Sequence, residues 1–173
     1  MLKESETEKG TISVIIFEVE GEQFAIDLLH AREIIQKGQI RRLPQTFEFV
    51  EGIYNYRGDI IYVINLSKKL ELHKYMSYKS KEDVEEEEEQ SDEKYLVIVN
   101  INNVNTGLLV DRIINISHIK SNELVELSPI FETSISMEFI EGVIKFKDRP
   151  RILLNVDKIL TEAEQVKIQK ELS

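Results

Sequence analysis

The feature that most constrains the fold of this chain is an ungapped internal repeat. Residues 49–70, FVEGIYNYRGDIIYVINLSKKL, align with residues 139–160, FIEGVIKFKDRPRILLNVDKIL, with six identities in 22 positions. Most of the other pairs exchange one apolar residue for another. Tandem copies of one supersecondary unit explain such a pattern best. The sequence therefore predicts a single structural unit that is built twice.

Each copy of the repeat is preceded by a strand, a turn and a second strand. Residues 12–28, ISVIIFEVEGEQFAIDL, place apolar runs on both sides of a glycine turn, and residues 95–113, YLVIVNINNVNTGLLVDRI, place them around an asparagine-rich turn. Glycine and asparagine accept the positive φ that tight hairpins require. Several short strands in each copy favour a small closed or half-closed barrel, because closure removes exposed sheet edges. We expect two such barrels to pack together, since neither alone buries much surface.

The two copies diverge at the turn inside the repeat. Arg57-Gly58 of the first copy becomes Lys147-Asp148 in the second, where Pro150 restricts the backbone. Arg57 is predicted to lie at a hairpin tip, where its planar guanidinium can bind a carboxylate or backbone carbonyls of a partner. An arginine that is simply solvated at a turn is the alternative. A difference at matching turns suggests that the two copies have different surface roles.

Composition predicts a soluble cytoplasmic protein. In 173 residues, 42% are apolar, which is enough for a buried core. No run of apolar residues is long enough for a membrane helix, and the first residues lack the pattern of a secretory signal. Cysteine is absent, which fits a reducing compartment. The three histidines are far apart, so the sequence predicts no metal site.

The charge is concentrated in one segment. The formal net charge is −10, but residues 82–93 hold nine acids and no base, so the rest of the chain sums to −1. Without a basic stripe, the chain is not expected to bind nucleic acid. Residues 73–93 are predicted to form a flexible acidic loop, because this composition buries too little to offset the entropy of ordering. Either the loop is only solvated or it docks a basic partner.

No motif for catalysis is present in the sequence. The chain lacks a phosphate-binding glycine loop, a G-x-S-x-G nucleophile motif and an H-E-x-x-H metal motif. We therefore predict no catalytic residues and no cofactor, and a binding module is the better interpretation.

Residues 161–173 are predicted to form a C-terminal helix. Thr161 and Glu164 make a capping box. Ile159, Ala163 and Val166 fall on one face, which we expect to pack on the barrels. Binding of a partner by this face is the alternative.

Several segments in order resemble the CheW family of chemotaxis coupling proteins. They are FAIDLLHAREI, Leu43-Pro44, FVEGIYNYRGDIIYVINL, TGLLVDRI and FIEGVIKFKDRPRILLNVDKIL, and the resemblance runs from about Val14 to Leu160. It implies a mainly β fold: two tandem five-stranded SH3-like β-barrel subdomains with a groove between them, plus short helices and the C-terminal helix. The single domain would span 12–160, with subdomains at about 14–72 and 94–160.

The resemblance also implies a non-catalytic adaptor that couples chemoreceptors to the histidine kinase CheA. Its partners would be the cytoplasmic tip of the receptors and the regulatory domain of CheA, which would recruit the chain to membrane-associated arrays. The family's receptor contacts match Glu33, Asn55, Arg57 and Gly58, with Val110 and Asp111 on the opposite wall of the groove. Its kinase contacts match Ile15, Leu28 and Ala31. Ala31 is smaller than the aliphatic residue usual there, and Tyr56 replaces a common leucine.

Two other functions stay open at this point. Coupling proteins fused to a receiver domain share the CheW-like fold, but no receiver sequence is present here. A tandem β-barrel could also bind peptides or nucleic acid, although the missing basic stripe argues against nucleic acid.

Overall fold

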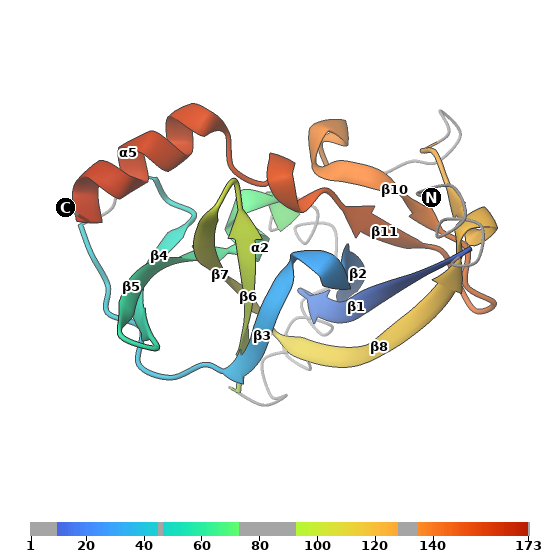
Figure 1. Ribbon diagram of the computed structural model, residues 1–173, viewed down its shortest axis with the longest axis horizontal. Coiled ribbons are helices and arrows are strands. Elements are labelled where there is room, and N and C mark those ends of the chain that lie inside the picture. Colours follow the sequence, from blue (N-terminus) through green and yellow to red (C-terminus); the bar gives the residue numbers. More distant parts are fainter. Residues whose placement is uncertain (1–9, 45–46, 73–92, 128–134, 173) are drawn as a thin grey trace, which may run out of the picture.

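The computed structural model describes residues 10–44, 47–72, 93–127 and 135–172, whose strands form two sheets side by side along the long axis of the molecule (Figure 1). The first half of the chain forms the strands β1 (Thr11–Val19), β2 (Glu22–Asp27), β3 (Ala31–Gln36), β4 (Val50–Tyr56) and β5 (Asp59–Asn65). The second half forms β6 (Tyr95–Ile101), β7 (Val104–Val110), β8 (Arg112–Lys120), β9 (Leu124–Val125), β10 (Ile140–Ile144) and β11 (Arg151–Leu154). The helical elements are η1 (Leu28–His30), α2 (Leu66–Lys69), η2 (Ser121–Glu123), η3 (Met137–Phe139), η4 (Val156–Lys158) and α5 (Glu162–Leu172). The predicted fold class, mainly β with a C-terminal helix, is confirmed.

The two sheets do not follow the two halves of the chain. The six-stranded sheet has the order β8-β1-β2-β11-β10-β9, and the five-stranded sheet has the order β3-β6-β7-β5-β4. The hairpin β1–β2 of the first half of the chain joins β8–β11 of the second half, and the hairpin β6–β7 of the second half joins β3–β5 of the first. Each exchanged hairpin joins the other half on both sides. Parallel pairs join β2 with β11 and β7 with β5, and antiparallel pairs join β1 with β8 and β6 with β3. We call this arrangement the hairpin exchange.

The hairpin exchange changes the subdomain boundaries that the sequence suggests. The ranges 14–72 and 94–160 each contain strands of both sheets, so they do not coincide with the sheets. The predicted five strands per barrel become six in one sheet and five in the other. Alternating apolar residues predict which strands exist, but both copies offer equivalent edges, so the pattern cannot tell which copy a hairpin joins. Of the predicted acidic loop, residues 73–92 lie outside the described residues.

Several of the residues that are identical in both copies lie at a β-bulge or close the repeat by a hydrogen bond. The register of β4 against β5 shifts between Val50 and Gly52, and that of β10 against β11 shifts between Ile140 and Gly142. A β-bulge of this kind places two residues opposite one and bends the strand. The repeated asparagine closes the unit in the same way in both copies. The backbone nitrogen of Asn65 donates to the carbonyl of Phe49 at 2.8 Å, and that of Asn155 donates to the carbonyl of Phe139 at 2.8 Å.

The repeated glycine leaves room for a segment that closes each sheet. A Cβ on Gly52 would lie 2.3 Å from the carbonyl oxygen of Arg41, whose backbone exchanges two 2.8 Å hydrogen bonds with Ile53. A Cβ on Gly142 would lie 2.9 Å from the carbonyl oxygen of Val125 in β9. In both copies a further piece of chain therefore runs along the outer edge of the repeat, which leaves no free edge there.

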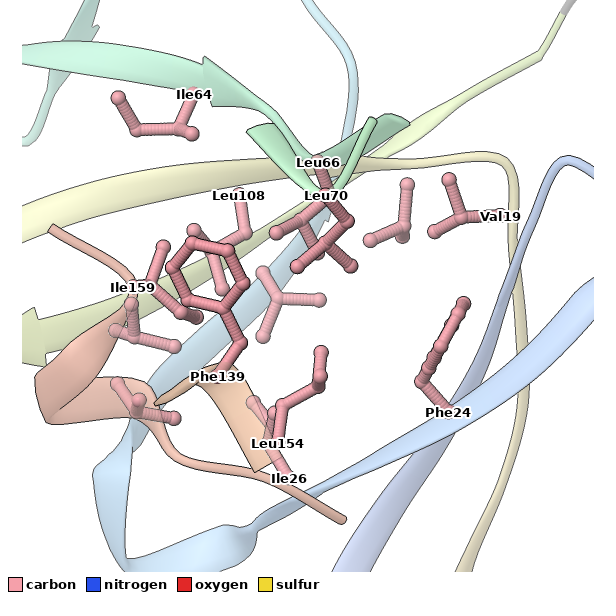
Figure 2. Close-up of a cluster of buried hydrophobic side chains, with 14 of the residues drawn as sticks. Val19, Phe24, Ile26, Ile64, Leu66, Leu70, Leu108, Phe139, Leu154 and Ile159 are labelled. Atoms are coloured by element: carbon pink, nitrogen blue, oxygen red, sulfur yellow. The ribbon is translucent and has the colours of Figure 1, made fainter. Parts of the chain in front are cut away.

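One hydrophobic core joins the two sheets. Figure 2 shows Phe139, Leu154 and Ile159 of the second copy beside Ile64 and Leu70 of the first, and all five side chains are buried. Phe24 and Ile26, on the exchanged strand β2, belong to the same cluster. Side chains from both copies therefore fill one shared interior.

Helix α5 begins with the predicted capping box but buries a different face. The backbone nitrogen of Glu164 donates to Thr161 Oγ1 at 3.1 Å, and that of Thr161 donates to Glu164 Oε1 at 2.8 Å. Val166 and Ala163 are exposed, whereas Gln165 and Ile168 are buried. Gln165 Nε2 donates to the carbonyl of Ile101 at 3.0 Å, and a polar anchor of this kind is invisible to a search for apolar faces.

Within the described residues, none of the helices has the length and apolar character needed to span a bilayer.

Candidate functional site

The turn between β4 and β5 is a two-residue hairpin, as predicted. Tyr56 pairs with Asp59, which leaves Arg57 and Gly58 at the tip with φ of 51° and 87°. Asn55 Oδ1 accepts a hydrogen bond from the Gly58 nitrogen at 3.0 Å. Two positive φ angles match the right-handed twist of the flanking strands, so the turn holds the Arg57 backbone in a defined conformation.

Glu33 on β3 reaches the same tip. Its Oε2 atom accepts from the Tyr56 hydroxyl at 2.9 Å and from Arg57 Nε at 3.2 Å, and Arg57 Nη2 lies 3.0 Å away. Because β3 and β4 are the two end strands of their sheet, this contact joins its opposite edges. The hydrogen bond to the carboxylate raises the pKa of Tyr56, since it favours the protonated hydroxyl.

We call Glu33, Asn55, Tyr56, Arg57 and Gly58 the Arg57 corner. The Arg57 side chain is 72% exposed and that of Glu33 is 32% exposed. An ion pair this exposed contributes little to stability, so its charges can be shared with a partner at small cost. Four of the six predicted receptor contacts therefore lie together on one solvent-facing corner.

The other two predicted receptor contacts lie elsewhere. Arg57 precedes β5 and Asp111 follows β7, and because these strands run parallel the two residues lie at opposite ends of the pair. Val110 is fully buried in the core. Val110 and Asp111 thus do not face the Arg57 corner across a groove.

Asp111 instead holds the turn between β1 and β2. Its Oδ2 atom accepts from the Glu20 nitrogen at 2.7 Å, and its own nitrogen donates to the Glu18 carbonyl at 2.9 Å. Lys94 Nζ lies 3.5 Å from Oδ1. These groups border a pocket of about 230 Å³ between the two sheets, which Ser67 and Asn65 also line. The contacts of Asp111 tie one sheet to the other.

Comparison with known proteins decides the family. The family model described as the CheW-like domain matches residues 13–164. The chain belongs to the CheW family. The chemotaxis protein CheW of Treponema pallidum (strain Nichols) is 30% identical over 158 residues, covering 90% of this chain and 85% of that protein. The chemotaxis protein CheW of Thermotoga maritima is 31% identical over 152 residues, covering 86% of this chain and 87% of that protein.

A solved CheW structure shares the fold. The crystal structure described as scaffolding protein TtCheW from Thermoanaerobacter tengcongensis superposes with a TM-score of 0.69 at 27% identity, covering 86% of this chain and 91% of that one. The resemblance seen in the sequence is confirmed, and the chain is an adaptor of the chemotaxis signalling system.

The predicted kinase contacts of this CheW-family chain differ in exposure. Ile15 is fully buried on β1, so its side chain packs the core and presents no surface. Leu28 is the first residue of η1 and Ala31 follows its last, and both are half-buried and pack against the core. Leu29, which the sequence analysis did not select, is 90% exposed. Its orientation follows from Asp27, whose Oδ1 accepts from the Leu29 nitrogen at 2.9 Å and starts the short helix.

Leu29 gives η1 an exposed apolar side chain. In the described part of the chain, no three His, Asp or Glu side chains gather closely enough to hold a metal ion. The arrangement can bind a partner through the exposed leucine at η1 and the exposed arginine at the Arg57 corner.

Proposed function

We propose that this CheW-family chain couples the cytoplasmic tip of chemoreceptors to the regulatory domain of CheA, and that it catalyses no reaction itself. The observation that carries the proposal is the Arg57 corner. There the exposed guanidinium of Arg57, on a tight turn, is oriented by the carboxylate of Glu33 on β3. An adaptor of this kind acts in the cytoplasm, at membrane-associated receptor arrays.

The chemistry of the corner suits a contact with a polar helical tip. A guanidinium offers a planar fork of donors that fits a carboxylate or paired carbonyls. Glu33 contacts Nε and Nη2 of Arg57, which fixes the orientation of the guanidinium, and it provides an acceptor beside it. Specific binding then depends on a few groups held in place, as in other interfaces where arginine dominates the energy.

Arg57→Ala is expected to leave the fold intact and to weaken binding of a receptor-tip fragment at least tenfold, about 1.4 kcal/mol or more. Arg57→Lys should recover only part of the affinity, because lysine keeps the charge but lacks the fork. Titration calorimetry measures the affinity and thermal unfolding checks the fold. Arg42, whose side chain is 84% exposed, provides the matched control, and Arg42→Ala should bind normally. Wild-type binding by a folded Arg57→Ala protein would contradict the assignment.

We propose that the kinase domain binds at Leu28 and Ala31 and at the exposed Leu29 between them. Leu29→Ser is expected to weaken binding of the kinase regulatory domain about tenfold, because burying a leucine at an interface contributes about 1.5–3 kcal/mol. Leu28→Ser is a less clean test, since that side chain also packs on the core. Val166→Ser, at another exposed apolar position, is the control. If receptor affinity falls while kinase affinity holds, the two surfaces are assigned the wrong way round.

A reconstitution tests the coupling itself. Kinase activity is measured in mixtures of CheA and receptor fragments with and without this chain. We expect receptor control of the kinase only when the chain is present, and equal activity in both mixtures would reject the proposal.

A further inference from the structure

The turn of the second copy presents unpaired positive charge. Residues 145–150 connect β10 to β11, which begins at Arg151, and we call residues 145–151, KFKDRPR, the basic turn. Lys145, Lys147 and Arg149 are exposed and form no ion pair with any other described residue. Three such cations in five positions stand out on a chain whose formal net charge is −10.

The fourth cation of the turn acts internally. Arg151 Nη1 and Nη2 each lie 2.9 Å from an oxygen of Asp148, and Arg151 Nε donates to Gln23 Oε1 at 2.7 Å. The guanidinium also lies over the Phe146 ring, 4.6 Å from its centroid, and the side chain is only 11% exposed. This clamp neutralises the one carboxylate of the turn and ties the turn to β2.

The clamp persists at neutral pH. The bidentate hydrogen bond from Arg151 lowers the pKa of Asp148 to about 2, so the carboxylate stays ionised and paired. Pro150 further restricts the backbone. The turn therefore holds one shape and leaves three cations facing solvent.

Two acids lie beside the turn, and within the described residues neither forms an ion pair with its three exposed cations. Glu22 is next to Gln23 on β2, and Glu123 accepts from the Lys145 nitrogen through its carbonyl at 2.9 Å. The Glu123 carboxylate accepts a hydrogen bond through Oε1 from the backbone nitrogen of Lys120 at 2.9 Å. Lys120 is itself exposed and adds positive charge on this side.

We propose that the basic turn is a docking site for an acidic segment of a partner protein. A short run of carboxylates can pair with three cations on one rigid turn. A flat anionic membrane or a nucleic-acid duplex presents a wider field of negative charge than one turn can match, and the chain has no basic stripe that would extend the contact. The turn also has no large apolar tip residue of the kind that inserts into lipid.

This inference is independent of the proposed coupling function. The Arg57 corner and the basic turn occupy matching positions in the two copies, yet the first pairs its arginine with Glu33 and the second leaves three cations open. Duplication thus supplied two turns at matching positions. The first is a two-residue turn between Tyr56 and Asp59, the second is a longer turn between Ile144 and Arg151, and the two carry different chemistry.

The test uses the full chain and a fluorescent peptide of about six glutamates, with anisotropy recorded from about 50 to 200 mM salt. We expect binding that weakens with salt, and a loss of tenfold or more in Lys147→Glu/Arg149→Glu at the lowest salt. Lys37→Glu/Lys158→Glu carries the same change in net charge at other exposed positions, and its affinity should stay within twofold of the wild type. Receptor-fragment binding should be equal in all three proteins.

Three outcomes would overturn the proposal. One is no peptide binding by the wild type at the lowest salt. Another is equal loss in both double variants, which would mean that only net charge matters. The third is tighter binding to vesicles rich in phosphatidylglycerol than to the peptide, with the same dependence on Lys147 and Arg149, which would assign the turn to a membrane surface.

Discussion

Gly52→Ala is expected to lower the free energy of unfolding by about 3–5 kcal/mol. This effect is large for a substitution that removes no side-chain contact. The added Cβ would lie 2.3 Å from the Arg41 carbonyl oxygen and 2.9 Å from its carbon. Both atoms are backbone, so a side-chain rotation cannot relieve the clash. The Arg41 segment must move away, and its two hydrogen bonds to Ile53 are lost. Urea unfolding followed by circular dichroism measures the change.

Two other glycines provide controls for this prediction. A Cβ on Gly107 would meet only side chains, at 3.4 Å and beyond, and the equivalent residue in the other copy is Ala25. Gly107→Ala should therefore cost less than about 1 kcal/mol. Gly58→Ala should cost about 1 kcal/mol, because Gly58 has open space but a φ of +87°. If Gly52→Ala unfolds at the same urea concentration as Gly107→Ala, the close approach of Arg41 is not essential.

The second large effect concerns separated halves of the chain. Residues 1–81 and 82–173, each produced alone, are expected to lack a cooperative unfolding transition, and mixing them should restore one. The first fragment holds β1 and β2, but their partners β8 and β11 lie in the second fragment. Phe24 and Ile26 would lose Leu154 and Ile159 from their cluster and face water. No small barrel can form from either half.

Circular dichroism and size-exclusion chromatography distinguish the cases. The intact chain is the reference, and the mixed fragments should elute at its volume with its strand signal. Independent folding of residues 1–81 would mean that β1 and β2 can pair with their own copy, and the hairpin exchange would then not be required for stability.

The sequence predicted the parts of the fold that depend on local pattern. The repeat, the hairpin turn at Arg57-Gly58 and the cap at Thr161 all follow from spacing and from residues with particular backbone preferences, and the structure confirms them. The hairpin exchange could not be predicted, because equivalent strands of two similar copies offer equivalent edges. The buried face of α5 was missed because its anchor is Gln165, a polar residue whose partner lies 64 positions away.

The candidate site was predictable only in part. Family resemblance selected Glu33 and Arg57, but their contact arises because the sheet curls until its end strands meet, which no local pattern encodes. Burial separates the other candidates: Ile15 and Val110 belong to the interior, whereas Leu28 and Ala31 are half-buried. The exposed Leu29 was not among the candidates. An alternating apolar pattern indicates two faces of a strand but not which of them a second sheet will cover.

The parallel joint between β2 and β11 has a consequence for biosynthesis. Strand β2 leaves the ribosome well before its partner strand, because Phe24 pairs with Ile152 and Ala25 with Leu153. Translation at about 5–20 residues per second leaves β2 waiting for several seconds without that partner. Its apolar side chains reach their final packing only after β11 has been translated.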